Sequence, residues 1–345
     1  MLINKKHILF FLFFVLSINA IKAQLIEKGK YELTGVRFVG NVAIPTQVLQ
    51  TTVTAKESPG WFSQTLQKYT SFGEEAVYFD PALIIPDQEA LRDFYFSYGY
   101  FKAKINSKYE IDTINGTASI YYLIDEGSPA ILKSLKISGL DELPYEFMEN
   151  VQSIAAIDTT LPFSGKLIDE KKNTILTFCR DHGYMLVNTT GAPEVVIDTI
   201  KNRVDVSINF TLGNRYKVSD IKVEKAGDGK DLVEDELVKE VAAIKTDSYY
   251  SFFDIQKAQV RLYRTNLFNS AIITGIVSDT SGNKVPLNIF TDIGLLHELS
   301  PEIIINNEDN VFNLGFGIGY IRKNFLGGAR KFTLSTSAAD RKSVV

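Results

Sequence analysis

The sequence is poor in the residues that build reactive and metal-binding sites. Its 345 residues include one cysteine, Cys179, and three histidines. A single cysteine cannot form an internal disulfide and cannot build a cysteine-based zinc site. His7, His182 and His297 have no local partner pattern for metal binding or catalysis. We therefore expect no enzyme activity, no cofactor and no metal.

Clusters of lysine and arginine are also missing. The chain carries 37 basic and 41 acidic side chains, for a formal net charge of −4, and no basic segment interleaved with aromatic residues. A nucleic-acid partner is therefore not expected. The chain has no G-x-S-x-G elbow of a hydrolase, and GFGIG at residues 315–319 lacks the spacing of a dinucleotide-binding loop. What remains is a binding or structural role.

Long apolar runs are absent except for one short run at the N-terminus. Lys5 and Lys6 precede the apolar residues 8–16, and small and polar residues follow up to Ala23. This pattern predicts a secretory signal peptide over residues 1–23, because an anchor helix would need about twenty apolar residues. We expect cleavage after Ala23, with Ala20 as the alternative.

Three similar segments follow at nearly constant spacing. They read DQEALRDFYFSYGYFKAKI from residue 87, DEKKNTILTFCRDHGYMLVN from residue 169 and DIQKAQVRLYRTNLFNSAI from residue 254. Gly99, Gly183 and Asn266 hold the same place, 84 and then 83 residues apart. Each can take the left-handed conformation that ends a helix. A period of this length predicts tandem domains and is too long for a solenoid repeat.

Each copy carries the same order of predicted elements: strand, helix, helix, strand, strand. The alternation is clearest at residues 204–212, where apolar and polar side chains take turns. The fold class is therefore α+β, with tandem β-α-α-β-β modules in which two helices cover one face of a small sheet. The predicted modules span residues 24–128, 129–214 and 215–294.

The first module carries a predicted insertion at residues 56–86. Its side chains Trp61, Phe62, Leu66 and Tyr69 would form an aromatic stripe if the segment is helical. Such a stripe suits a membrane interface or a partner groove, or it packs on its own module. The sequence leaves both interpretations open.

Small sheets of this kind also leave edge strands with unpaired N–H and C=O groups. These groups can pair with an incoming strand, or the edges can stack against neighbouring copies. Both alternatives remain open at this point.

The final segment, residues 311–338, alternates in a different way. In its first half bulky apolar residues share one strand face, and Gly315, Gly317 and Gly319 lie on the other. A turn-rich stretch and a second alternating run follow, which together predict two strands of about ten residues typical of a membrane barrel. The glycines would either weaken the first strand or leave room for a group packed against it. We interpret residues 295–345 as a linker, containing His297, and the start of an outer-membrane β-barrel.

Taken together, the signal peptide, the three modules and the closing hairpin resemble the BamA/TamA family of outer-membrane assembly proteins, whose periplasmic modules are called POTRA domains. The resemblance covers nearly the whole mature chain. It rests on VRFVGN, IPDQEALRDFYFSYGYFKAKI, CRDHGYMLV and YRTNLFNSA, and most specifically on NFLGGARKFTLS. It implies periplasmic modules that bind unfolded outer-membrane polypeptides by strand addition, a barrel in outer-membrane lipid that inserts or translocates them, and periplasmic accessory proteins as further partners.

The resemblance also supplies the candidate site, which is the first barrel strand and turn. Its residues are Gly315, Gly317, Gly319, Asn324, Phe325, Leu326, Gly327 and Gly328. One feature departs from the family: its usual C-terminal strand ending in an aromatic residue is absent, and a closed barrel needs at least eight strands. We therefore expect the sequence to be a fragment. A secretion transporter for one dedicated substrate and the periplasmic part of an enzyme-linked barrel are the alternative functions.

Overall fold

The computed structural model describes residues 30–280, 282–308 and 311–343. The predicted signal peptide lies outside these residues. The chain divides into two compact units, one with the residues up to Ser134 together with 157–169 and 195–206, the other with the remaining segments. None of the helices within the described ranges has the length and apolar character to cross a membrane.

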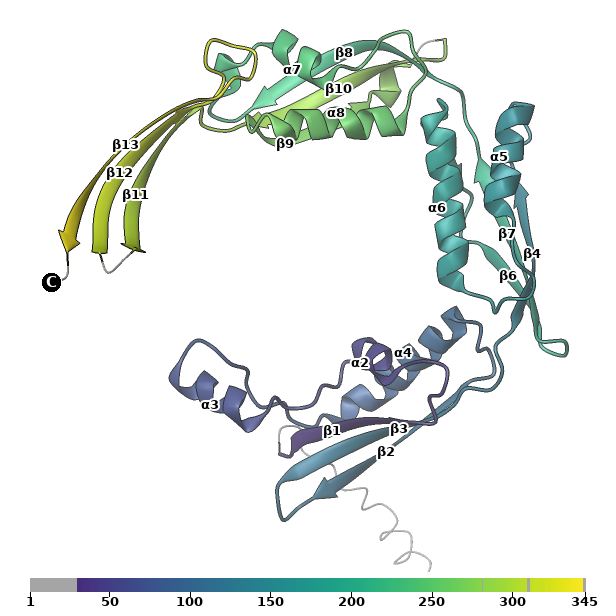
Figure 1. Ribbon diagram of the computed structural model, residues 1–345. Helices are drawn as coiled ribbons and strands as arrows, with labels where there is room; N and C mark the ends of the chain where they lie inside the picture. Colours follow the sequence, from purple (N-terminus) through teal and green to yellow (C-terminus); the bar gives the residue numbers. More distant parts are fainter. Residues whose placement is uncertain (1–29, 281, 309–310, 344–345) are drawn as a thin grey trace, which may run out of the picture. The chain divides into compact units, whose positions relative to one another are not determined.

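The first repeat forms a three-stranded sheet under two helices. Its strands are β1 (Glu32–Val39), β2 (Lys104–Asp112) and β3 (Thr117–Asp125) in the order β1-β3-β2, with β1 parallel and β2 antiparallel to β3. Helices α2 (Thr46–Thr52) and α4 (Ile84–Ser97) lie on one face of this sheet (Figure 1). Every second residue of β3 is buried beneath them, in keeping with the period of two along a strand.

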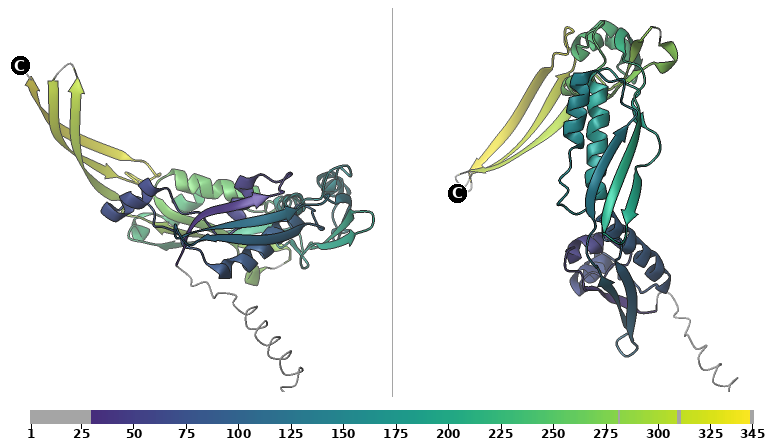
Figure 2. Two further views of the ribbon diagram at one scale, coloured as in Figure 1. Left: turned by 90° about the horizontal axis from the view of Figure 1, so that it is seen from below. Right: turned by 90° about the vertical axis from the view of Figure 1, so that its right-hand side faces the viewer.

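The second and third repeats have the same architecture. The second contains β4 (Ile131–Ser138), α5 (Tyr145–Ala155), α6 (Gly165–Asp181), β5 (Asn188–Thr189), β6 (Glu194–Asp198) and β7 (Arg203–Thr211). The third contains β8 (Lys217–Ala226), α7 (Asp235–Ala242), α8 (Phe252–Arg264), β9 (Phe268–Gly275) and β10 (Lys284–Ile293). Figure 2 shows α5 and α6 side by side along their sheet. In the second sheet β5 and β6 both pair with β7, so its edge strand is interrupted.

The predicted α+β class with tandem β-α-α-β-β modules is therefore confirmed. The predicted helix ends are confirmed as well, because Gly99, Gly183 and Asn266 have φ angles of 86°, 103° and 56°. Short 3-10 turns complete the described elements: η1 (Pro81–Leu83), η2 (Lys230–Leu232) and η3 (Val277–Asp279).

The C-terminal segment is a three-stranded antiparallel sheet with one strand more than predicted. Its strands are β11 (His297–Glu308), β12 (Val311–Arg322) and β13 (Phe332–Ser343), in that order. Placing His297 in a linker was wrong, because it begins β11. Pro301 obscured this strand in the sequence; it is tolerated because β11 is an edge strand, where a missing N–H need not break the ladder.

Two buried carboxylates hold the core of the first repeat together. Asp87, 1% exposed, accepts hydrogen bonds from the backbone N–H groups of Thr54 and Ala55 at 2.7 and 3.0 Å and from the Tyr122 hydroxyl at 2.8 Å. These contacts attach the segment that leaves α2 to α4 and β3. Burial, followed by the hydrogen bond to Asp87, raises the pKa of Tyr122 above its usual range.

Glu126 makes the matching contacts at the other end of α2. Its carboxylate accepts from the N–H of Ala43 at 2.9 Å and from the Tyr95 hydroxyl at 2.8 Å. Burial and this hydrogen bond raise the pKa of Tyr95 as well. The short helix α2 is thus fixed at both ends by carboxylates from other elements, which compensates for its lack of a side-chain N-cap.

A backbone relay recurs where one repeat meets the next. The C=O of Gly99 accepts from the N–H of Ala130 at 2.9 Å, and the C=O of Ala130 accepts from the N–H of Phe163 at 2.8 Å. Gly183, Tyr216 and Tyr250 repeat this relay at 2.9 and 3.0 Å. The glycine that ends the second helix of one repeat thereby anchors the first strand of the next.

We predict that Asp87→Ala destabilises the first sheet by about 3 kcal/mol, because it leaves two backbone donors and the Tyr122 hydroxyl without their buried acceptor. Hydrogen exchange of β3 amides, followed by mass spectrometry, measures this change in the free energy of opening. Glu89→Ala, on the exposed side of the same helix, is the matched control and should change it by less than about 0.5 kcal/mol. Equal protection in the two variants would contradict a role for Asp87.

Cys179 should be nearly unreactive in the folded chain. Burial raises the pKa of its thiol to about 11, and the side chain is fully buried in the second repeat. The reactive thiolate is therefore depleted by roughly a hundredfold at pH 8 relative to an unperturbed thiol, and shielding slows the reaction further. Labelling with an aromatic disulfide should be slow in buffer and fast in denaturant. Fast labelling in buffer would show that this core is open.

Candidate functional site: sheet edges and a docked hairpin

The insertion in the first repeat covers the outer edge of β1. The N–H of Leu33 donates to the C=O of Val77 at 2.8 Å, and the C=O of Leu33 accepts from the N–H of Ser58 at 2.7 Å. The N–H of Phe79 donates to the C=O of Tyr31 at 2.8 Å. These bonds satisfy backbone groups that an edge strand otherwise presents to solvent. The first half of this edge is therefore closed by the chain itself, since the carboxylate of Glu57 also accepts from the N–H of Val36.

The opposite edge of this sheet is β2, which pairs with β3 over nine residues on its inner side. On its outer side the C=O of Ile105 accepts a long hydrogen bond of 3.4 Å from the Gln88 side chain. The N–H and C=O groups of successive residues point to opposite sides of a strand, so those of Ser107 and Tyr109 point outward like the C=O of Ile105. This edge is available to an incoming strand.

Charged side chains stand along β2. Glu110 accepts hydrogen bonds from Lys108 and from the Tyr121 hydroxyl, both at 3.1 Å, and these contacts lower the pKa of its carboxyl. Charges on an open edge oppose uncontrolled pairing between copies. In the second repeat the charges of β6, Glu194 and Asp198, lie only at its ends, and the residues between them, Val195 to Ile197, are exposed and apolar.

The three glycines of the predicted barrel strand lie on the buried face of β12. Gly315, Gly317 and Gly319 are buried, whereas Phe316 and Ile318 between them are 66% and 60% exposed. The exposed apolar face continues onto both neighbouring strands through Leu299, Ile303 and Leu334. The predicted separation of a bulky and a bare face is thus present.

Space on the glycine face is limited by the neighbouring strands. A Cβ atom at Gly317 would lie 3.1 Å from the Thr336 carbonyl oxygen and 3.2 Å from the Cβ of Ser337. A Cβ atom at Gly319 would lie 3.3 Å from the carboxylate of Glu302. These close approaches support the steric explanation of the glycines.

The turn between β12 and β13 is docked on the third repeat. The amide of Asn324 donates to the C=O of Leu232 at 3.1 Å, and its side-chain oxygen accepts from the N–H of Ala329 at 3.2 Å. Ala329 packs against the core of the third repeat. Asn324 thus closes its own turn and attaches it to η2.

Left-handed backbone conformations explain why this turn contains asparagine and glycine. Asn324, Leu326, Gly327, Gly328 and Ala329 have φ angles of 52°, 56°, 75°, 66° and 57°. Glycine and asparagine tolerate this region, but leucine and alanine are strained there. The ring of Phe325 stacks on the ring of Phe332, with 4.9 Å between the ring centroids, and this contact fixes the turn against β13.

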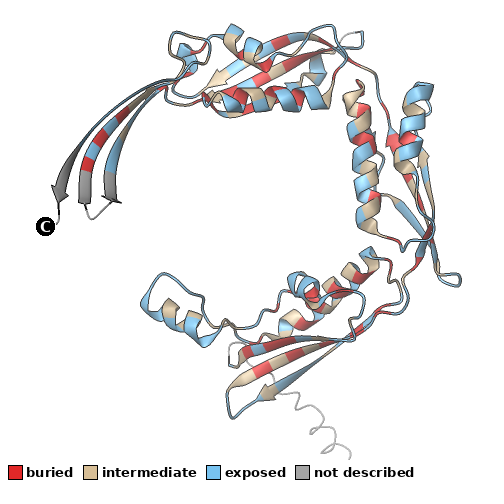
Figure 3. Ribbon diagram, in the orientation of Figure 1, coloured by how far each residue is buried: buried red, intermediate tan, exposed pale blue. Residues whose placement is uncertain are grey.

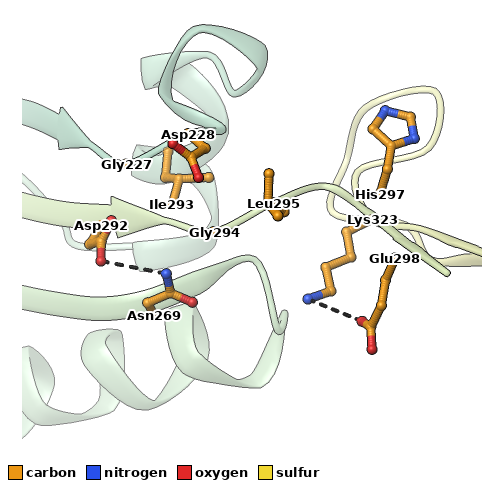
Figure 4. A pocket seen from close by; sticks show the side chains of 10 residues that line it. All are labelled: Gly227, Asp228, Asn269, Asp292, Ile293, Gly294, Leu295, His297, Glu298 and Lys323. Atoms are coloured by element: carbon orange, nitrogen blue, oxygen red, sulfur yellow. Dashed lines mark hydrogen bonds and ion pairs between the residues drawn. The ribbon is translucent and has the colours of Figure 1, made fainter. Parts of the chain in front are cut away.

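A polar cavity of about 520 Å³ separates the third sheet from β11 and β12 (Figure 4). It is lined by Gly227, Asp228, Asn269, Asp292, Ile293, Gly294, Leu295, His297, Glu298 and Lys323. Within it Lys323 faces Glu298 at 3.8 Å, and Asn269 contacts Asp292 at 3.5 Å. No group of side chains suited to hold a metal ion occurs within the described ranges. The cavity is a polar joint between two sheets.

The sequence thus placed its eight candidate residues in one strand and one turn, where the structure also has them. It missed Glu302 and Leu232, the partners of the glycines and of Asn324. Glu302 belongs to the unpredicted strand β11, and Leu232 contributes only its backbone. The alternation of Glu298, Ser300 and Glu302 with apolar residues is the signal that could have indicated β11, whereas no residue pattern indicates the backbone partner Leu232.

The aromatic stripe of the insertion is helical and does not pack on its own module. Helix α3 (Trp61–Tyr69) has no buried residue (Figure 3). Trp61, Phe62 and Tyr69 are 77%, 62% and 83% exposed. The alternative in which the stripe packs against the first sheet is therefore wrong.

Comparison with known proteins identifies relatives of this arrangement. Residues 31–127 match the POTRA family, described as "Surface antigen variable number repeat". The chain is 24% identical over 189 residues to "Outer membrane protein assembly factor BamA" of Nitratidesulfovibrio vulgaris, covering 52% of this chain and 23% of that protein. It is 20% identical over 303 residues to the BamA of Buchnera aphidicola, covering 87% of this chain and 44% of that protein. The chain thus spans less than half the length of these relatives.

A solved structure shares the fold. The crystal structure of BamA from Haemophilus ducreyi lacking POTRA domains 1-3 matches with a TM-score of 0.50 and 14% identity, covering 61% of this chain and 37% of that chain. The POTRA match and the two BamA relatives, together with this shared fold, confirm the resemblance found in the sequence.

We predict that Asn324→Gly releases the turn from the third repeat, because it removes the bond to Leu232 and the bond that closes the turn, while glycine tolerates the left-handed backbone at this position. Amide exchange at Phe325–Ala329 should accelerate about tenfold, as expected when a hydrogen bond of ordinary strength is lost. Lys331→Ala, an exposed neighbour in the same connection, should leave the exchange unchanged. Equal rates in both variants would contradict docking through Asn324.

Proposed function

We propose that this relative of BamA, which carries POTRA-like modules in tandem, binds unfolded outer-membrane polypeptides by strand addition and assists their insertion or translocation at the outer membrane. The names of the relatives as outer membrane protein assembly factors support the general role. The role is one of binding and positioning, without a chemical step.

One observation carries the proposal: the first sheet has one edge closed over its first half and one available edge. The insertion occupies the first half of the outer side of β1, whereas β2 pairs on one side only. An extended polypeptide can therefore join this sheet at β2. Backbone hydrogen bonds supply the affinity and demand little of the side-chain sequence, as a receptor of many different barrel proteins requires.

The C-terminal sheet supports the proposed location. Its exposed apolar face, formed by Leu299, Ile303, Phe316, Ile318 and Leu334, matches the hydrocarbon interior of a membrane. We place this sheet in outer-membrane lipid as the start of a barrel, with β11 as its first strand, followed by the glycine-bearing strand β12 and the Asn324–Gly328 turn. The modules then lie in the periplasm after removal of residues 1–23, where accessory proteins are a further class of proposed partner.

The proposed boundaries of the parts follow those predicted from sequence. Residues 24–128, 129–214 and 215–294 are three modules, and residues 295–345 belong to the membrane part. The POTRA match at residues 31–127 lies inside the first of these segments.

We predict that Ser107→Pro weakens binding of a urea-unfolded outer-membrane barrel protein about tenfold, because it removes an outward N–H from the middle of β2. Proline is tolerated on the free side of an edge strand, so the sheet should remain folded. Fluorescence anisotropy of the labelled polypeptide measures the affinity, and circular dichroism checks the fold.

Ser107→Ala is the matched control, since it removes the hydroxyl and retains the N–H. It should bind like the unaltered chain. If Ser107→Pro also binds normally, strand addition at β2 is wrong.

A further inference from the structure

The edge strand of the third repeat lacks the charges that protect β2. Strand β9 reads FNSAIITG and pairs with β10 on one side only. An uncharged edge of eight residues is a strong template for any extended chain. Some other feature must control access to it.

Two side chains of α8 occupy this edge at its centre. The N–H of Ala271 donates to the hydroxyl of Tyr263 at 3.1 Å, and the C=O of Ala271 accepts from the amide of Gln259 at 3.4 Å. In the ladder Ala271 lies opposite Thr291 of β10. Because both of its backbone groups bond to α8, they point away from β10 and toward the free edge. A strand added to β9 would need the same two groups.

The other repeats differ at the equivalent position. Three residues before the helix-ending Gly99, Gly183 and Asn266 stand Phe96, Arg180 and Tyr263. Phe96 has no hydroxyl to accept from a backbone N–H. Arg180 donates to the C=O of Val187, ahead of the interrupted edge strand. Occupation of both the N–H and the C=O of one edge residue by α8 is thus a feature of the third repeat.

We propose that Tyr263 and Gln259 form a guard that closes the β9 edge, so that an extended polypeptide pairs there only after displacing both side chains. The inference rests on the proposed function, since it assumes that clients bind by strand addition. It assigns different roles to the repeats: β2 of the first accepts a client directly, whereas β9 of the third accepts one against competition.

The two side chains of the guard can be displaced at low energetic cost. Tyr263 is 45% exposed, so its hydroxyl can turn to water without leaving a buried polar group unpaired. An incoming strand replaces the two side-chain hydrogen bonds of Ala271 with two backbone hydrogen bonds. It also forms further backbone hydrogen bonds along the rest of β9. The competition should weaken binding at β9 roughly tenfold, which corresponds to one hydrogen bond of ordinary net strength, that of Tyr263, because the Gln259 bond of 3.4 Å is long and weak.

The test compares matched positions on the two edges. A photo-crosslinking residue is placed at Asn106 of β2 or at Ile272 of β9, whose side chains are both exposed on the face away from the helices. Each labelled chain is mixed with a urea-unfolded outer-membrane porin and irradiated. The comparison variant carries Tyr263→Phe with Gln259→Met, which keeps the ring and the chain length and removes both polar groups.

We expect crosslinking at residue 106 to be equal with and without the double substitution, and crosslinking at residue 272 to rise about tenfold with it. An unchanged yield at residue 272, high or low, would overturn the guard, while crosslinking at residue 106 would still support the proposed function. Absence of crosslinking at residue 106 would instead overturn strand addition at β2.

Hydrogen exchange provides a readout that needs no client. The Ala271 amide should exchange at least tenfold faster in the double variant, because its acceptor is lost, while amides of β10 should be unchanged. Slow exchange of Ala271 in the double variant would overturn the guard. Faster exchange throughout β10 would show that the substitutions loosen the sheet and that Tyr263 and Gln259 act through packing, which also contradicts it.

Discussion

Unpaired backbone groups at the edges of small sheets are the constraint on which this structure depends. A three-stranded sheet has two edge strands and one central strand, so most of its residues lie beside an edge. The three repeats meet this constraint in the same way on one side. A bridge joins the beginning of each first strand to a segment ahead of the second helix: Glu32 with Tyr78, Ile131 with Pro162, and Lys217 with Tyr249. The chain thus protects its first-strand edges and leaves the opposite edges to other solutions.

The opposite edges of the three sheets differ from one another in continuity, in charge and in the side chains bonded to them. Strand β2 is continuous and carries charges, β9 is uncharged with its centre bonded to α8, and the edge of the second sheet is broken into β5 and β6. The break follows from Gly191 and Pro193 between the two pieces, because proline cannot donate to a ladder and glycine weakens a strand. Repeats with one fold therefore present three different surfaces to an extended chain.

Much of this architecture is predictable because it follows from local rules. The near-constant spacing of Gly99, Gly183 and Asn266 indicated three copies, and their left-handed φ angles confirm why these residue types end the helices. Contacts formed by the backbone could not be predicted in this way. The relay through Ala130 and Tyr216 uses only N–H and C=O groups, which every residue but proline possesses. Asp87 shows a third case: it is a charged residue in the first turn of α4, yet it is buried and accepts from the segment after α2 and from β3.

The joint between the third repeat and the C-terminal sheet follows a different physical principle from the earlier joints. There the chain continues from β10 through Gly294 into β11, and the Asn324 side chain supplies a second attachment at Leu232. Between these two points lies a polar cavity whose ion pair, Lys323 with Glu298, is partly exposed. Exposed ion pairs contribute at most about 1 kcal/mol, far less than a buried apolar contact of similar size. Apolar contacts flank this cavity, because Leu296 in the connection is buried in the core of the third repeat and Ala329 of the turn packs against the same core. The N–H of Lys323 also donates to the C=O of Leu296 at 2.8 Å. The glycine-bearing strand is therefore held beside the third repeat by apolar burial together with the backbone bond at Leu296 and the Asn324 bond at Leu232.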